Sequence, residues 1–356
     1  MMSVEVNSLK KAKGCLFGLA IGDAMGMPTS FLTPAEIQRT FGVIQDFQEP
    51  PHGHIYHQGL HRGEVTDDTE QALALARSFI RLRQVDPNDI VQELQAWAQK
   101  VEHKYASPFG PSTQQAIEQI RNGIALKEAG RNGETNGAAM RIAPLGIIHG
   151  IRGSSLKETL YDVALTCLPT HGTQVAISAT TAVAWSIALC FRNHLSIADV
   201  LEGAEEAAEA GSQIGCPKIA PSVARRIAWV RQQCRRKRPR EKALADLYAL
   251  FGGGVLAADS VPVALGVFAF CQGDPCQIIL TAANYGGDSD TIGAIAAAIG
   301  GAYRGDQAFP AEWVNTVQQV NRIDLSILAE ALVSLAQHWQ PCNINQVATF
   351  FEGGAL

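Results

Sequence analysis

The chain has 356 residues, of which 47% are hydrophobic, so it can bury a large core as one big domain or as two, and a disordered chain is excluded. Its formal net charge of −5 argues against a dedicated nucleic-acid-binding protein, since such domains carry a clear basic excess. The eight cysteines form no CxxC pair and several lie inside apolar runs, which indicates reduced core thiols in a cytoplasmic chain.

The first predicted element is the apolar run GCLFGLAIGDAMGMP at residues 14–28. Three lysines precede it, as in a secretory signal, but Asp23 interrupts the run and no convincing cleavage site follows, so we reject a signal peptide. The longest apolar stretch starts at Val175 and is shorter than the roughly 20 residues that a membrane span needs. We expect a buried helix there and no membrane association.

The recurrent pattern along the chain is helical. Apolar residues spaced three and four apart predict helices at residues 69–82, 89–101, 112–123 and 325–339, whereas strand-like alternation is hard to find. Glycines and prolines separate these segments without a long linker, and no repeat of fixed period is apparent. We therefore predict an all-α fold in one compact domain that spans residues 1–356.

Two of the helical patterns begin with paired aspartates. Residues 66–69 read TDDT and residues 288–291 read DSDT, each just ahead of an Ala-rich apolar run. Helix capping explains one carboxylate at each start, because aspartate accepts hydrogen bonds from free N–H groups and its charge suits the helix dipole. Capping does not explain two, because adjacent acids repel, so we expect a positive group among them.

The four carboxylates and their flanking hydroxyls form an all-oxygen donor set, which suits Mg²⁺ or Mn²⁺ rather than zinc. If the two helix starts meet in space, they would hold two ions roughly 3.5–4 Å apart with one aspartate bridging. Spacing alone leaves two solvated helix caps as the alternative, because the sequence does not show that the helices meet.

Seven segments in order along the chain resemble the ADP-ribosylglycohydrolase family. They are GCLFGLAIGDAMGMP (14–28), VTDDT (65–69), SPFGPSTQQAI (107–117), TNGAAMRIAPLG (135–146), PTHG (169–172), ADSVPVAL (258–265) and NYGGDSDTIGAIAAAIGGAYRG (284–305). The resemblance runs through most of the chain and is highly specific, because all seven segments are in register. It implies a compact orthogonal helical bundle with a dinuclear Mg²⁺ or Mn²⁺ centre between the helix starts.

The resemblance also implies roles for individual residues. Thr66, Asp67 and Asp68 would ligate one ion, Asp288 and Thr291 the other, and Asp290 would bridge them, with Asp67, Asp68 and Asp290 also catalytic. The implied substrate-binding residues are Gly110, Ser112, Asn136, Gly137, Ala138, Met140 and His171. Family members cleave ADP-ribose from an acceptor at the distal ribose C1, so the implied partner is an ADP-ribosylated protein or a small ADP-ribose conjugate.

One position departs from the family pattern. Many members have a glutamate a few residues after the GDAxG segment, commonly assigned as an acid/base or metal-contacting residue, and the aligned residue here is Ser30. Glu36 or Glu64 would substitute only if the fold brings them inward. Otherwise a metal-bound hydroxide oriented by Asp67 or Asp68 does the work, or catalysis is weak or lost.

Two further classes of function therefore stay open. One is a hydrolase of a smaller N-glycoside, such as a nucleoside or nucleotide, in which metal ions bind the ribose in the same way. The other is an ADP-ribose-binding protein that has kept the fold and the ions without turnover. The intact set of four aspartates argues against such decay, because a chain under no metal constraint should lose those acids first.

Four other features are weighed against plainer explanations. The run HGHIYHQGLH (52–61) matches no standard zinc spacing and is predicted to be a loop at the substrate entrance. Arg141 would pair with a phosphate or form a structural salt bridge. We expect Asp23 to fix local backbone rather than to ligate an ion, and the basic run 231–242 to be solvated surface, with a phosphate-rich partner as the minority hypothesis.

Overall fold

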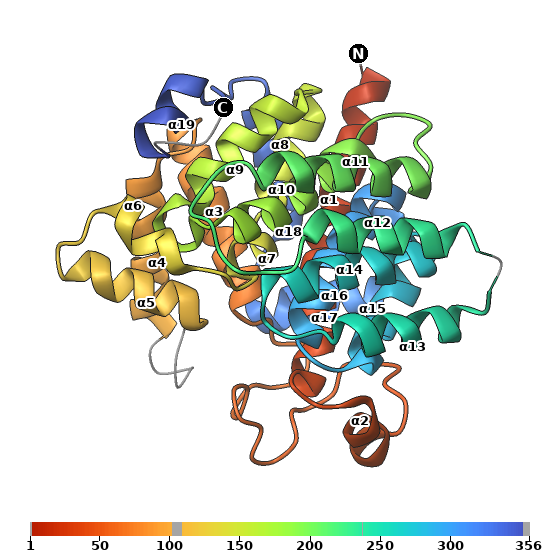
Figure 1. Ribbon diagram of the computed structural model, residues 1–356. Helices are drawn as coiled ribbons and strands as arrows, with labels where there is room; N and C mark the ends of the chain where they lie inside the picture. The colour runs from red at the N-terminus through yellow and green to blue at the C-terminus, as the bar shows by residue number, and fades with distance from the viewer. Residues whose placement is uncertain (1, 102–108, 237, 352–356) are drawn as a thin grey trace.

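The computed structural model describes residues 2–101, 109–236 and 238–351. Every regular element in these ranges is helical, and the only β-type pairings there are two isolated bridges. Figure 1 shows the helices crossing one another at varied angles around a common centre. The prediction of an all-α fold is confirmed.

The helix bounds follow chain order. The α-helices are α1 (Met2–Gly26), α2 (Pro34–Phe41), α3 (Asp67–Leu82), α4 (Pro87–Val101), α5 (Pro111–Arg121), α6 (Leu126–Ala129), α7 (Gly137–Met140), α8 (Ala143–Arg152), α9 (Leu156–His171), α10 (Gln174–Cys190), α11 (Ile197–Gly211), α12 (Val223–Cys234), α13 (Arg240–Phe251), α14 (Ala257–Phe270), α15 (Pro275–Tyr285), α16 (Ser289–Arg304), α17 (Ala311–Asn321), α18 (Leu325–Ala336) and α19 (Ile344–Phe350). Short 3-10 helices are η1 (Met27–Thr29), η2 (Gly130–Asn132) and η3 (Asp306–Ala308).

The four helices predicted from periodicity are present as α3, α4, α5 and α18, with ends shifted by one to three residues. Two of the shifts have one cause: α4 and α5 begin at Pro87 and Pro111. Proline suits the first helical position because the N–H it lacks would have no intrahelical partner there. The predicted buried helix from Val175 is α10, whose residues after Gln174 are all buried.

The N-terminal glycines fix how α1 packs on α16. Glycines 14, 18, 22 and 26 recur every four residues on one face of α1, and a Cβ at any of them would lie 1.9–2.4 Å from a carbonyl oxygen of α16. Gly293 and Gly301 of α16 return the contact, since a Cβ there would lie 2.5 and 1.9 Å from oxygens of α1. The two backbones touch only because these positions lack side chains. This contact places the end of α1 beside the start of α16.

One hydrophobic cluster contains buried side chains from Ala12 to Val347. The segment 42–66, between α2 and α3, is a long loop that lies with α2 at one end of the molecule in Figure 1. The single-domain boundaries 1–356 stay a prediction.

Membrane-spanning potential is confined to one bent segment of the described chain. No single helix there has both the length and the apolar character to cross a bilayer. Residues 6–29 and 34–41 meet both requirements only when taken together, and they are bent by 84° relative to each other.

Candidate active site

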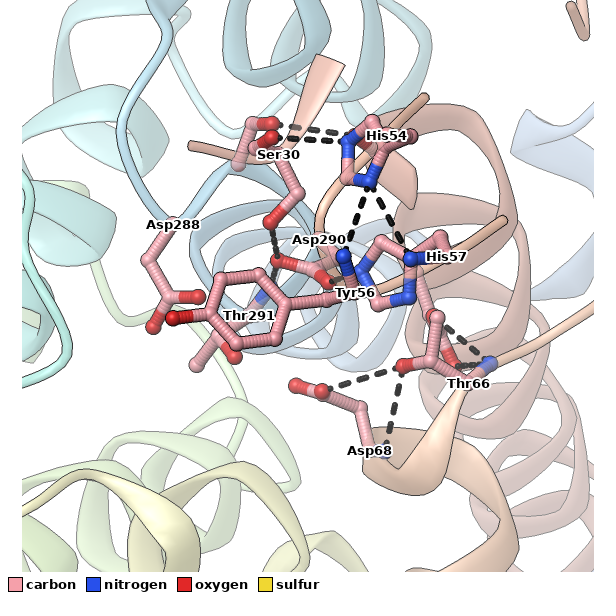
Figure 2. Close-up of polar contacts among 12 residues, drawn as sticks. Ser30, His54, Tyr56, His57, Thr66, Asp68, Asp288, Asp290 and Thr291 are labelled. Atoms are coloured by element: carbon pink, nitrogen blue, oxygen red, sulfur yellow. Dashed lines mark hydrogen bonds and ion pairs between the residues drawn. The ribbon is translucent and has the colours of Figure 1, made fainter. Parts of the chain in front are cut away.

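Both aspartate-bearing helix starts are hydrogen-bonded to the end of α1 or to the residues just after it, and Figure 2 shows Asp68, Asp288 and Asp290 in one region. Asp23 of α1 accepts hydrogen bonds from the backbone N–H groups of Thr66, at 3.0 Å, and of Thr69, at 3.1 Å. Ser30, just after η1, donates its hydroxyl to Asp290 Oδ1 of α16 at 2.7 Å. The carboxyl group of Asp23 therefore caps α3, as expected for a residue that fixes backbone, and the two pairs of aspartates meet.

At the start of α3, Thr66 is the N-cap and its hydroxyl accepts from the Asp68 N–H at 3.3 Å. The same hydroxyl donates to Asp68 Oδ2 at 3.2 Å, while Asp67 Oδ2 accepts from Gln71 Nε2 at 3.0 Å. Asp68 is 1% exposed, yet its Oδ1 is buried without a hydrogen-bond partner. An unpaired carboxylate oxygen in a dry site is costly, so this atom is a candidate ligand for a positive group.

At the start of α16, the two aspartates are held by residues far away in the sequence. Asp288 Oδ2 accepts from Asn136 Nδ2, which also donates to Ser260 Oγ at 3.0 Å. Asp290 is more fully paired, since Oδ1 accepts from Ser30 and from the Thr291 N–H, and Oδ2 lies 2.9 Å from His57 Nε2. An ion on Asp290 Oδ1 would therefore have to displace one of these donors, whereas Oδ2 keeps a free acceptor position.

The aspartates of the cluster resist ionisation. Burial, with added repulsion from Asp290, raises the pKa of Asp67 to about 7 and that of Asp23 to about 6. Burial and neighbouring carboxylates likewise raise the pKa of Asp68 and of Asp288 well above the ordinary aspartate value. A positive group placed among these carboxylates would relieve both effects.

Asp290 is the exception. Burial alone would raise its pKa, but the hydrogen bond and charge of His57 and the hydroxyl of Ser30 hold that pKa below the ordinary value. The same contact raises the pKa of His57 in spite of its burial. His57 and Asp290 thus behave as a buried ion pair at the centre of the cluster.

The donor set fits hard divalent cations. Thr66, Asp67, Asp68, Asp288, Asp290 and Thr291 supply only oxygen atoms, one of which lacks any partner, and Mg²⁺ and Mn²⁺ prefer such ligands. As the side chains stand, no three Asp, Glu, His or Cys groups of the described chain converge tightly enough to hold one ion together. An ion would therefore have to draw these carboxylates inward, with hydroxyls completing its ligands.

The histidine-rich loop at 52–61 reaches into the site through two of its histidines. His54 and His57 are 5% and 6% exposed, and His54 Nε2 lies 2.9 Å from the Ser30 carbonyl oxygen. His54 Nδ1 accepts the backbone N–H groups of Tyr56 and His57 at 3.3 and 3.1 Å. Because Nδ1 accepts, Nε2 carries the proton and donates to Ser30. His54 thereby fastens the loop to Ser30.

Neither suggested substitute for that glutamate points into the cluster. Glu36 is exposed and forms the capping box of α2 with Thr33. Glu64 accepts the backbone N–H of His61 at 2.6 Å within its own loop. The residue that does reach Asp290 is His57, which the sequence pattern did not single out beyond its place just before VTDDT.

The predicted substrate loops meet on the far side of Asp288. Ser112, at the start of α5, accepts from the backbone N–H groups of Glu134 and Thr135 at 3.3 and 3.4 Å, which ties α5 to the loop that ends at Asn136. Asn136 in turn contacts Asp288. Gly110, at the exposed N-cap of α5, is the most open of the predicted positions.

His171 and the residues of α7 are buried beneath this loop. Its Nδ1 lies 2.8 Å from Thr170 Oγ1, its Nε2 lies 3.0 Å from Thr135 Oγ1, and the side chain is fully buried. A Cβ on Gly137 would lie 3.0 Å from the His171 ring, so only glycine fits directly above it. Ala138 and Met140 of α7 are also buried. Their predicted contact with substrate stays a prediction.

Arg141 is held by neutral side chains and not by the predicted salt bridge, while its contact with a phosphate stays a prediction. Its guanidinium is fully buried and donates to Gln71 Oε1 at 2.6 Å and to Thr170 Oγ1 at 2.7 Å, and it has no ion pair within the part of the chain that the structure describes. Burial lowers the pKa of Arg141 to about 10. Gln71 also donates to Asp67, so its side-chain amide links the Arg141 guanidinium to the Asp67 carboxylate.

The basic run 231–242 lies on the surface, as predicted. Arg231 pairs with Glu205 at 2.9 Å and Arg238 with Asp246 at 2.5 Å. Residue 237 lies outside the described chain, as do residues 107 and 108 of the predicted substrate segment.

Comparison with known proteins finds a matching family model and similar chains. A family model described as ADP-ribosylglycohydrolase matches residues 5–342. The chain is 33% identical to the uncharacterized protein YegU of Escherichia coli (strain K12), over 91% of this chain and 96% of the relative. It is 28% identical to the ADP-ribosylarginine hydrolase Tri1 of Serratia proteamaculans (strain 568), over 93% and 81%.

A solved structure shares the fold. The protein titled ADP-ribosylglycohydrolase-related protein complex superposes with a TM-score of 0.69 at 26% sequence identity, covering 93% of this chain and 99% of its own. These matches confirm the resemblance that the seven sequence segments indicate.

Proposed function

The chain belongs to the ADP-ribosylglycohydrolase family of enzymes, and on that premise we propose that it is a divalent-metal-dependent hydrolase that releases ADP-ribose by cleaving the bond at the distal ribose C1. The observation that carries the metal dependence is the buried, unpaired Asp68 Oδ1 among aspartates whose pKa values are raised. Such a cluster is stable in its ionised form only with cations among the carboxylates.

The proposed metal ligands are assigned by where each residue lies in the cluster. Thr66, Asp67 and Asp68 would hold one Mg²⁺ or Mn²⁺ ion, and Asp288 and Thr291 a second, with Asp290 between them. When bound, the ions would supply Lewis-acid polarisation of ribose hydroxyls and of a water beside C1. Asp67 is the only one of the four aspartates that is not fully buried as a residue.

The side chains of the protein supply charge and orientation. Departure of the leaving group creates an oxocarbenium-like centre at C1, which the carboxylates of Asp67 and Asp68 stabilise electrostatically. Ser30 and His57 hold both oxygens of Asp290, and Asn136 holds Asp288, so these carboxylates keep one orientation during the reaction. The place of the family glutamate is thus taken by a hydroxyl and an imidazole that position Asp290.

The target of the enzyme is an ADP-ribosylated protein side chain or a small ADP-ribose conjugate, as the substrates named for its relatives suggest. All eight cysteines are free thiols, which agrees with the proposed cytoplasmic location.

The decisive experiment is release of free ADP-ribose from arginine-, serine- and nucleic-acid-linked substrates and from simple nucleosides, each with Mg²⁺, with Mn²⁺ and with chelator. We expect metal-dependent release of ADP-ribose from at least one linkage, and release about 10³-fold slower from an Asp68→Asn variant. Cleavage of nucleosides alone would make the enzyme a small N-glycoside hydrolase. Binding of ADP-ribose without any turnover would make the chain a reader of the modification.

A further inference from the structure

Two exposed aromatic rings stand beside the carboxylate cluster. Phe31 and Tyr56 are 38% and 56% exposed, and their ring centroids lie 4.5 Å apart with planes tilted by 49°. Each follows or precedes a residue that bonds Asp290, since Phe31 comes after Ser30 and Tyr56 comes before His57. In the view of Figure 2 the Tyr56 ring overlaps the carboxylates of the cluster.

The backbone is held in a costly conformation to present these rings. Phe31 has a φ of 62°, in the left-handed region that a bulky residue rarely adopts. Its N–H donates to the Gly287 carbonyl at 2.5 Å, and the Gly287 N–H donates to the Leu32 carbonyl at 2.9 Å. Strain of this kind persists where the surroundings enforce it, and it concentrates at functional sites.

His54 fixes one ring relative to the other. It bonds the carbonyl of Ser30, next to Phe31, and the N–H groups of Tyr56 and His57. The aromatic pair is therefore fastened to the same residues that orient Asp290. What sets the two rings apart from other exposed apolar side chains is that they contact each other and are held by residues that bond Asp290.

We propose that Phe31 and Tyr56 form the leaving-group subsite of the enzyme and select substrates whose leaving group is planar and linked to C1 through nitrogen. This inference rests on the proposed function. Its geometric basis is that Ser30 and His57, which both bond Asp290, are the chain neighbours of Phe31 and Tyr56. Aromatic faces bind planar delocalised groups and cations by stacking and cation–π attraction. An alcohol such as serine offers no such face.

The guanidinium of arginine and a nucleobase share this chemistry, and separate arms of the test distinguish them. Hydrolysis of arginine-linked, nucleobase-linked and serine-linked ADP-ribose is measured for the wild type, Phe31→Leu and Tyr56→Leu. Tyr56→Phe keeps the ring, and Ile55→Ala is the matched control, because Ile55 is 78% exposed on the same loop and outside the pair.

We expect the leucine variants to lower kcat/KM for one of the planar leaving groups by roughly 3- to 10-fold and to change the serine-linked rate by less than about twofold. Ile55→Ala should match the wild type, Tyr56→Phe should lose less than Tyr56→Leu because it keeps the ring, and the affinity for free ADP-ribose should not change in any variant. An equal loss on the serine-linked substrate, or weaker binding of free ADP-ribose, would overturn the leaving-group assignment.

Failure of the proposed function would be recognised by a different result, the absence of hydrolysis in the wild type. If the wild type cleaves none of the substrates, calorimetric binding of the intact conjugates replaces the rates. Weaker binding of a planar conjugate to the leucine variants, at equal ADP-ribose affinity, would still support the subsite in a chain without turnover. Equal binding of all conjugates to all variants would remove it.

Discussion

Two buried aspartates of this molecule, Asp162 and Asp68, are held in opposite ways. Asp162 lies on α9 and contacts the segment after α18, where its oxygens accept from Trp339 Nε1 and the Cys342 N–H, both at 2.7 Å, and His149 Nε2 lies 3.0 Å away. Asp68 is equally buried, but its nearest charged neighbours are other aspartates, and one of its oxygens has no partner.

The difference shows that burial alone does not identify a functional carboxylate. Asp162 is satisfied by donors from the protein itself, so it ties α9 to the segment after α18 and requires no ligand. The cluster around Asp68 combines like charges with too few donors, which stable protein interiors avoid. What separates the two sites is the shortage of positive partners around Asp68.

The largest effect is expected from Asp68→Asn. We expect hydrolysis of ADP-ribose conjugates to fall by about 10³-fold, because a charged ligand of one ion is lost. In chelator the same variant should unfold at an equal or higher temperature than the wild type, because one of the repelling charges is gone. A lower melting temperature in chelator would show that Asp68 is already satisfied without metal, as Asp162 is.

Asp162→Asn should have the opposite effects, a loss of stability without a loss of hydrolysis. We expect it to lower the free energy of unfolding by about 3 kcal/mol, equally with Mg²⁺ and with chelator, because it breaks a buried paired network. Denaturant unfolding in both buffers measures this difference. The rate of hydrolysis per folded molecule should stay at the wild-type value, and a loss specific to Mg²⁺ would contradict the separation of the two sites.

The third prediction concerns pH. The pKa of Asp67 is about 7 and that of Asp23 about 6, above the ordinary 3.8, so between about pH 4 and pH 7 the folded chain binds more protons than the unfolded chain. The free energy of unfolding in chelator should therefore fall as pH rises through this window. His57 acts in the same direction, because its raised pKa gives stability that is lost as pH rises.

Mg²⁺ should reverse this trend, since ions bind the ionised carboxylates. At a concentration of 100 times its Kd the metal should add about 2.7 kcal/mol to the free energy of unfolding. Because the Kd falls as the carboxylates ionise, the shift in melting temperature at a fixed Mg²⁺ concentration should grow from pH 5 to pH 8. A shift that is independent of pH would mean that the metal binds elsewhere.

A smaller effect is expected from the residue that orients Asp290. His57→Leu removes the donor to Asp290 Oδ2 and should weaken Mn²⁺ binding about tenfold, as seen for partners of metal ligands in other proteins. His57→Gln keeps an N–H donor and should restore part of the affinity. His61→Gln is the control, because His61 is exposed on the same loop. Calorimetric titration with Mn²⁺ gives all three values.

The smallest effect is expected from the basic run. Arg231 pairs with Glu205 at the surface, and such pairs contribute about 0–1 kcal/mol. Arg231→Gln should leave both the hydrolysis rate and the affinity for ADP-ribose unchanged. A clear loss of ADP-ribose affinity would revive the hypothesis that this run binds phosphate.

Much of the fold was accessible from local pattern. Apolar residues at helical spacing, bounded by glycine and proline, predict the ends of α3, α4, α5 and α18 to within three residues. Both signals are local, because they act over one or two helical turns. The four-residue glycine spacing in α1 was recognised as a motif, but its physical role required the facing glycines of α16, which lie more than 270 residues away in the sequence.

The site was predictable only where its signal is local. Paired acids at a helix start are visible in any window that contains residues 66–69 or 288–291. The contact of His57 with Asp290 joins positions 233 residues apart, and the bond of Asn136 to Asp288 joins positions 152 apart. No periodicity specifies such pairs, because the whole packed fold decides which loop covers which helix start. The aromatic pair Phe31 and Tyr56 was missed for the same reason.

The most direct measurement is titration of the metal-free protein with Mn²⁺, followed by calorimetry and by electron paramagnetic resonance, in the wild type and in Asp290→Asn. The cluster should take up two ions per chain with magnetic coupling between them, and Asp290→Asn should abolish the coupling and release the ions. Absence of binding in the wild type, or uncoupled binding that Asp290→Asn leaves unchanged, would contradict a metal centre at these helix starts.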